Sequence, residues 1–94
     1  MAITVKFVGA LRHASGKGEL ALDCPEGTSI RVLVAKITGN APELKRSLIN
    51  QQLDPAYPNA LILVNGKEIS ILKGLDTKLE DGDEVVFVPV VHGG

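Results

Sequence analysis

The chain ends in two glycines, Gly93 and Gly94, and this C-terminal pair is the sequence feature best suited to chemistry. Glycine has no Cβ atom, so a backbone that ends in glycine can enter a narrow channel and present an unhindered carboxylate. Such a carboxylate could attack the α-phosphate of ATP and form an acyl adenylate. We expect a partner enzyme to use the ATP and to supply Mg²⁺ and basic side chains, because this chain has no phosphate-binding lysine loop and binds no cofactor itself.

No other residues in the sequence have the spacing of a catalytic or metal site. His13 and His92 are far apart, and the chain has one cysteine, so we expect no metal site. Asp81 and Asp83 flank a glycine, but the remaining ligands of a calcium loop are missing and a turn is expected. The serines lack the context of a nucleophile. We therefore expect a protein that is not itself an enzyme.

Composition predicts one small soluble domain. The 94 residues carry ten basic and eleven acidic side chains, and a net charge of -1 gives no electrostatic reason to expect nucleic acid or a membrane as partner. The sequence has no signal region or membrane-spanning apolar run, so a cytoplasmic location is expected. Cys24 ends an apolar alternation and is interpreted as a buried small hydrophobe rather than a reactive thiol.

The first half of the sequence predicts two strands and two helices. Alternating apolar residues indicate strands at 3–8 and 19–24, joined by a glycine-bearing, mobile loop at 9–18. Ile30, Leu33, Val34 and Ile37 then follow a helical period. Ser29 or Thr28 is expected to cap this helix, Gly39 to end it, and a second short helix to span 42–49, followed by a loop at 50–59.

The second half predicts three further strands. They are expected at 61–64, at 67–69 after a tight Asn65-Gly66 turn, and at 84–89, with a compact segment at 72–79 before the last. This order indicates an α+β fold, a mixed sheet of four to five strands with one main helix across it. The last strand is expected at the centre beside the first. Residues 1–89 form the domain and residues 90–94 a flexible tail.

The last strand is apolar on both faces, which predicts a docking surface. Val85 and Phe87 point one way and Val86 and Val88 the other, so one pair lies on the face without the main helix. Alternatively, residues 40–59 cover that face, or a central strand tolerates valine there. The residues expected to contact a partner are Val8, Leu63, Val86, Phe87, Val88 and Pro89.

An acidic stretch precedes and opens the last strand. Residues 76–84 hold five acids against one lysine, Lys78. A basic groove on a partner could recognise this stretch, but a solvated acidic turn is the favoured explanation.

Several motifs in the second half resemble those of a known family. The small ubiquitin-like sulfur carriers of the MoaD and ThiS type share, in the same order, Leu63-Val64-Asn65-Gly66-Lys67, Gly74-Leu75-Asp76-Thr77, Leu79-Glu80-Asp81-Gly82-Asp83-Glu84-Val85 and Phe87-Val88-Pro89-Val90-Val91-His92-Gly93-Gly94. The resemblance implies a β-grasp fold. It also implies that an enzyme of the ubiquitin-activating type adenylates the Gly94 carboxylate, which becomes a thiocarboxylate and delivers sulfur to an acceptor.

The resemblance leaves the branch of the family open. In the MoaD branch the acceptor is the molybdopterin precursor, bound by a larger catalytic subunit, and chain length and the second short helix favour this branch over ThiS. Val90 stands where a second proline is common in that branch. His92-Gly93-Gly94 also ends the eukaryotic ubiquitin-related modifier, which carries sulfur and is conjugated to lysines. A protein modifier joined through Gly94 to target lysines, and a ubiquitin-like interaction module, are therefore the alternatives.

Overall fold

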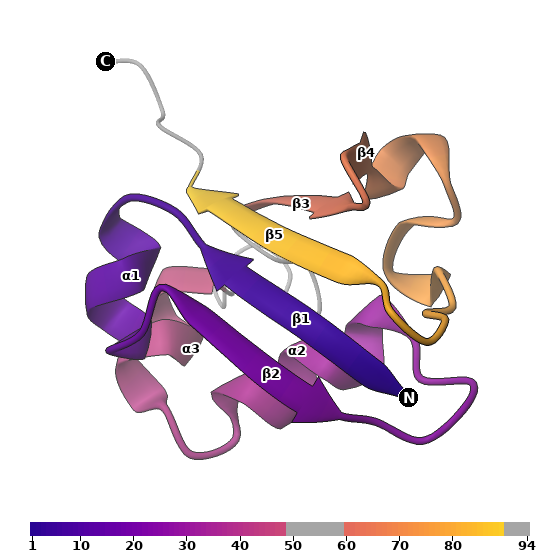
Figure 1. Cartoon of the computed structure of the whole chain (residues 1–94). Helices are drawn as coiled ribbons and strands as arrows, with labels where there is room; N and C mark the ends of the chain where they lie inside the picture. Colours follow the sequence, from indigo (N-terminus) through magenta and orange to yellow (C-terminus); the bar gives the residue numbers. More distant parts are fainter. Residues whose placement is uncertain (49–59, 90–94) are drawn as a thin grey trace.

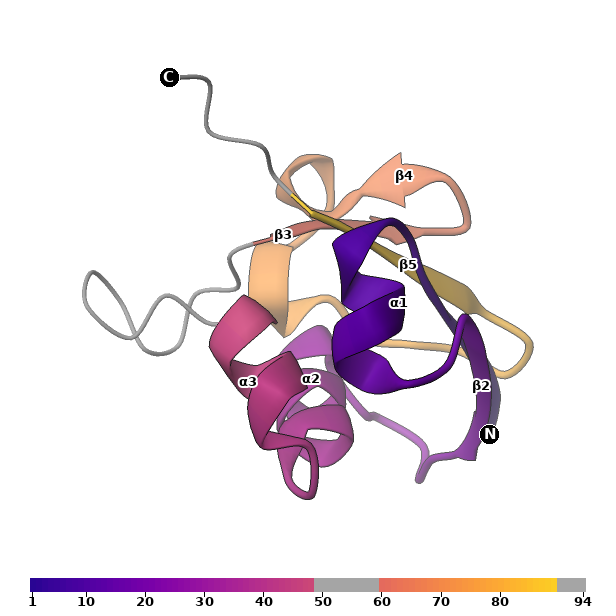
Figure 2. The same ribbon diagram turned by 90° about the vertical axis from the view of Figure 1, so that its left-hand side faces the viewer.

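The computed structural model describes residues 1–48 and 60–89, which form a mixed sheet with helices packed on one face (Figures 1 and 2). In chain order the elements are β1 (Ala2–Phe7), α1 (Ala10–Ser15), β2 (Glu19–Asp23), α2 (Ile30–Thr38), α3 (Pro42–Leu48), β3 (Ala60–Val64), β4 (Lys67–Glu68), the 3-10 helices η1 (Ile69–Ile71) and η2 (Gly74–Asp76), and β5 (Glu84–Pro89). The α+β class is confirmed. The loop predicted at 50–59, the last residue of the second helix and the tail at 90–94 lie outside the described residues.

The strand order is β2-β1-β5-β3-β4, so the last strand lies at the centre of the sheet, as predicted. β5 runs parallel to β1, with Val5 opposite Val85, and antiparallel to β3, with Ile62 opposite Phe87. Because β1 and β5 are parallel, both end at the same side of the sheet. The segment that follows β1 therefore lies beside the end of β5.

The core lies between the inner face of the sheet and α2. The Ser29 hydroxyl caps α2 by accepting a hydrogen bond from the Val32 N–H at 3.3 Å, which confirms one of the two predicted caps. The rings of Phe7 and Phe87 stack beneath the sheet with centroids 5.6 Å apart. Cys24 is buried and free, as a small hydrophobe would be.

Residues 10–15 form a helix where a mobile loop was expected, and that prediction is wrong. Leu11 is 2% exposed and fixes α1 to the core. Gly16, with φ of 78°, ends the helix by donating its N–H to the Arg12 carbonyl at 3.0 Å. The helix has six residues and one buried side chain, so the sequence holds no helical repeat from which it could be predicted.

The turn between β3 and β4 has the geometry that its residues predict. Asn65 and Gly66 have φ of 50° and 83°, the left-handed conformations of a two-residue hairpin. The strand after the turn is shorter than expected, because Ile69 begins η1 and turns its side chain into the core.

Candidate functional site

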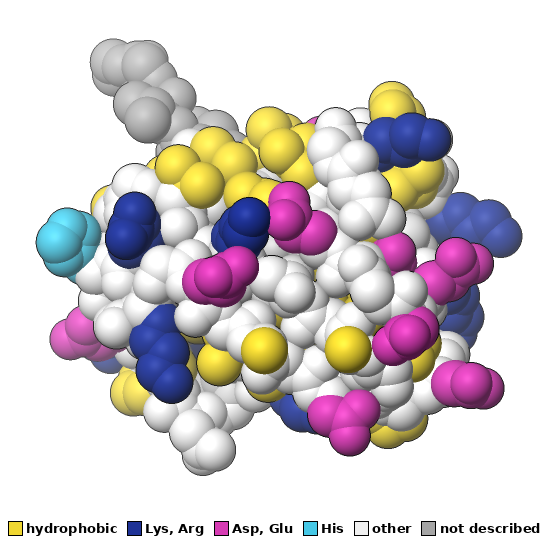
Figure 3. Space-filling model, in the orientation of Figure 1, with side chains coloured by type: hydrophobic (Ala, Val, Ile, Leu, Met, Phe, Trp, Pro, Cys, Tyr) yellow, Lys and Arg dark blue, Asp and Glu magenta, His cyan; other side chains and the backbone are white. Residues whose placement is uncertain are grey.

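The outer face of the sheet, opposite the helices, carries an apolar patch over the end of β5. Val86 and Val88 alternate with the buried Val85 and Phe87 and are partly exposed on this face. Together with side chains from β3 and the end of β1 they form what we call the outer patch: Val8, Leu61, Leu63, Val86 and Val88. Val8 is 44% exposed and Leu61 40%. Hydrophobic side chains gather there in the space-filling view (Figure 3).

Of the six residues predicted to contact a partner, four lie in the outer patch, and Phe87 and Pro89 do not. Leu63 and Val86 are cross-strand neighbours, and Val88 lies opposite Leu61, which completes the patch. Phe87 is 0% exposed on the inner face, so the prediction that it contacts a partner is wrong. Alternation along β5 places every second residue in the core, and the aromatic side chain fills it.

The helical face and the outer patch lie on opposite sides of the sheet. α3 packs near α1 and α2, so residues 42–48 do not cover the patch (Figure 2). Residues 49–59, the rest of the segment that was considered as a cover for this face, lie outside the described part.

A charged pair borders the outer patch. The Lys6 ammonium lies 2.9 Å from a carboxylate oxygen of Glu84, and Glu19 stands opposite Lys6 on β2. The hydrogen bond and the charge of Glu84, with a smaller contribution from Glu19, raise the pKa of Lys6 above its ordinary value. Lys6 is therefore charged at neutral pH, and it marks the side of the patch that faces β2.

The chain leaves the sheet directly beside the outer patch. Pro89, the last residue of β5, pairs with Ala60 and lies against Gly9, where a Cβ atom would come within 3.3 Å of the proline Cγ. Gly93 and Gly94 lie outside the described residues. The sequence places Gly94 five residues after Pro89, and five extended residues span at most about 17 Å.

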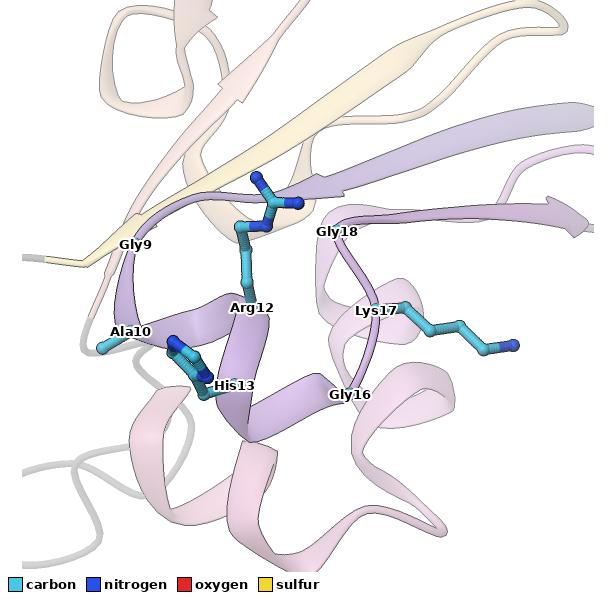
Figure 4. A pocket seen from close by; sticks show the side chains of 7 residues that line it. All are labelled: Gly9, Ala10, Arg12, His13, Gly16, Lys17 and Gly18. Atoms are coloured by element: carbon cyan, nitrogen blue, oxygen red, sulfur yellow. The ribbon is translucent and has the colours of Figure 1, made fainter.

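A shallow hollow of about 850 Å³ adjoins Pro89 on the side of α1. Figure 4 shows the residues that line it: Gly9, Ala10, Arg12, His13, Gly16, Lys17 and Gly18. The hollow was not predicted from the sequence, because residues 9–18 were expected to form a loop. The sequence does carry one indication of a basic surface here: three basic residues precede Glu19, which is the first acidic residue of the chain.

The acidic stretch before β5 has a structural role. One Asp81 carboxylate oxygen accepts a hydrogen bond from the Ala2 N–H at 2.7 Å. The Asp83 carboxylate accepts from the Asn65 amide and from the Glu80 N–H, both at 2.8 Å. These contacts join the turn to β1 and to the β3–β4 hairpin, so the fold explains Asp81 and Asp83 in addition to Glu84, which pairs with Lys6.

The described residues include no group of three or more His, Cys, Asp or Glu side chains placed to hold a metal ion. Among residues 1–48 and 60–89, no helix has the length and apolar character needed to cross a membrane.

Comparison with known proteins identifies relatives over the whole chain. The profile of the ThiS family matches residues 5–94. A putative sulfur carrier protein of Archaeoglobus fulgidus is 35% identical over 98 residues, and ubiquitin-related modifier 1 of Schizosaccharomyces pombe is 46% identical over 100 residues. Both alignments cover 100% of this chain and 100% of the relative.

A solved structure of similar sequence has the same fold. The putative molybdopterin converting factor, subunit 1, of Pyrococcus furiosus is 27% identical, with a TM-score of 0.75 over 96% of this chain and 99% of that one.

Proposed function

Because this chain belongs to the ThiS family and has the ubiquitin-like β-grasp fold, we propose that it is a sulfur carrier whose Gly94 carboxylate is adenylated and converted to a thiocarboxylate. A carboxylate oxygen attacks the α-phosphorus of ATP and pyrophosphate leaves. A hydrosulfide-level sulfur nucleophile then attacks the acyl carbon, AMP leaves, and the sulfur remains on Gly94. The chain supplies the carboxylate and a docking surface, and the partner enzyme supplies the catalytic groups and Mg²⁺.

One observation carries this proposal: the outer patch lies at the point where the chain leaves β5. Val88 is partly exposed and is followed by Pro89, after which five residues lead to Gly94. A partner that covers Val88 therefore contacts the chain six residues before the terminal carboxylate, at most about 20 Å from it. An adenylating enzyme of the ubiquitin-activating type that binds the patch could receive the carboxylate in its own active site.

For the sulfur acceptor we propose the molybdopterin precursor, bound to a larger subunit of a molybdopterin synthase-like complex. The chain length and the second short helix, now seen as α3 (Pro42–Leu48), support this branch of the family. The similarity to the Pyrococcus furiosus protein described above supports it as well. The same Gly94 thiocarboxylate could also deliver sulfur to another acceptor. The sulfur-carrier function therefore does not depend on the molybdopterin precursor being the acceptor.

The second candidate function is a protein modifier joined through Gly94 to lysines of target proteins. The 46% identity to the Schizosaccharomyces pombe modifier favours it. The ending His92-Gly93-Gly94 also resembles that of the eukaryotic ubiquitin-related modifier. In this case a lysine amine, rather than a sulfur nucleophile, attacks the adenylated acyl group, AMP leaves, the amine loses a proton, and an isopeptide bond forms. Both functions use the same tail and the same activation step.

Mass spectrometry of the protein from its own cells distinguishes the two functions. The Met1 ammonium donates to the Cys24 carbonyl at 2.7 Å and lies 3.3 Å from Asp23, so the protein should be captured with an antibody and without an N-terminal tag. We expect a free form in which sulfur replaces one oxygen of Gly94. Gly94 linked to lysines of other proteins would support the modifier instead, and an unmodified carboxylate as the only species would contradict both.

A further inference from the structure

The hollow beside α1 is lined by basic side chains and by no acidic one. Its lining contains Arg12, His13 and Lys17 and no carboxylate. Arg12 and Lys17 are exposed, and within residues 1–48 and 60–89 neither forms an ion pair. Lys6, the other basic residue that precedes Glu19, is paired with Glu84. Arg12 and Lys17 are therefore the two basic residues before Glu19 that the fold does not use in an ion pair.

The hollow adjoins the outer patch and the end of β5 at Gly9, which follows Val8 and lines the hollow. The Val8 N–H donates to the Phe87 carbonyl at 3.1 Å, which holds the end of β1 against β5. Gly9 follows and lies against Pro89. A protein that receives the tail must cover Pro89, so its contact area reaches Gly9 and the residues of α1.

The basic side chains of the hollow point in different directions (Figure 4). Arg12 extends from α1 toward the strands and lies against Gly18, where a Cβ atom would come within 2.9 Å of the guanidinium. Lys17 extends away from α1 on the far side of the connection to β2. Because the two charges diverge, they do not surround one small anion, and they suit a surface that presents several separate carboxylates.

We propose that Arg12 and Lys17 form a basic docking rim that pairs with carboxylates on the protein that receives the C-terminal tail. This inference rests on the proposed function, because such a partner is what brings a protein surface over Pro89. The outer patch provides apolar contact, and the basic docking rim orients the partner around the start of the tail. Charges at the edge of an interface act mainly on the rate of association and depend on salt.

Charge reversal in the full-length chain tests the basic docking rim. The variant Arg12→Glu/Lys17→Glu is compared with wild type as substrate of the ubiquitin-activating-type adenylating enzyme from the same organism, measured by ATP–pyrophosphate exchange. At low salt we expect KM for the carrier to rise on the order of tenfold, with kcat within about twofold. The difference should shrink at about 0.5 M salt, where screening is strong.

A matched control carries the same change in net charge elsewhere. Lys67→Glu/Lys73→Glu replaces two exposed lysines on β4 and after η1, at the other edge of the sheet, and its KM should stay within about twofold of wild type. Both variants should unfold within about 3 °C of wild type, since none of the four side chains is buried.

Each remaining outcome overturns a defined part of the proposal. If wild type is adenylated and both double variants have equal KM, the basic docking rim is refuted while the proposed function stands. If wild type is not adenylated, the proposed function fails and the basic docking rim with it. If the Arg12 and Lys17 variant keeps its KM but loses binding to a single-stranded RNA oligonucleotide, the assignment to a protein partner is refuted.

Discussion

Two adjacent residues of β5 have opposite roles because a strand turns successive side chains to opposite faces. Phe87 stacks on Phe7 in the core, whereas Val88 lies in the outer patch opposite Leu61. A substitution at one position therefore tests stability, and the same kind of substitution at the next tests docking.

Val88→Asp should abolish activation and leave the domain folded. A carboxylate in the centre of an apolar interface is desolvated without a partner, and we expect the catalytic efficiency of adenylation to fall on the order of a hundredfold or more. The site is partly exposed, so the free energy of unfolding should change by less than about 1 kcal/mol. ATP–pyrophosphate exchange and urea denaturation measure the two effects separately.

Phe87→Ala is the matched comparison on the inner face. It should lower the free energy of unfolding by about 3–5 kcal/mol, because it leaves a cavity beside the ring of Phe7. If Val88→Asp unfolds the domain, or if its adenylation is unimpaired, the role assigned to the outer patch is wrong.

At the scale of the element, the sequence pattern predicts those strands and helices that bury several side chains, and it does not predict α1, which buries one. The alternation of Ile3, Val5 and Phe7 and the helical spacing of Ile30, Leu33 and Val34 predicted β1 and α2, because several side chains of each element face the core. α1 has one such side chain, so only the packing of the whole fold shows that it is a helix. The basic docking rim depends on α1 and was missed for the same reason.

Leu11→Ala tests whether α1 is anchored by this single residue. Leu11 is buried against the core, and its truncation should lower the free energy of unfolding by about 2–4 kcal/mol. Hydrogen exchange of the Gly16 N–H, which donates to the Arg12 carbonyl, should speed up more than exchange in β1. Urea denaturation and NMR-detected exchange check both expectations.

Val32→Ala is the control for this experiment. Val32 lies on α2 with 54% of its surface exposed, so a similar truncation there should change the free energy of unfolding by less than about 0.5 kcal/mol. Equal effects of the two substitutions would show that α1 is not held by Leu11.

At the scale of the whole molecule, the fold brings the ends of two parallel central strands to one side of the sheet. Sequence alone located Gly94 and the alternation that produces most of the outer patch, since both are features of short segments. It could not show that the residues after β1 lie beside Pro89, because that depends on the parallel pairing of β1 with β5, which are about eighty residues apart. The outer patch, the basic hollow and Pro89 adjoin one another for this reason.

Deletion of Gly94 separates docking from chemistry in the complete molecule. Every buried core side chain of the described residues lies before Val88, so the free energy of unfolding should change by less than about 0.5 kcal/mol. The outer patch also remains, and affinity for the adenylating enzyme, measured by calorimetry without ATP, should stay within about threefold of wild type.

Adenylation of the shortened chain should nevertheless fall on the order of a hundredfold or more. The new terminal carboxylate, on Gly93, stops about 3.4 Å short of its position in the full chain, and misplacement of a reacting group by 1 Å can already cost about a hundredfold. Gly94→Ala keeps the length and adds a Cβ atom, so it reports how narrow the channel is. Full cellular function of the shortened chain would contradict both the carrier and the modifier and favour an interaction module whose tail is never activated.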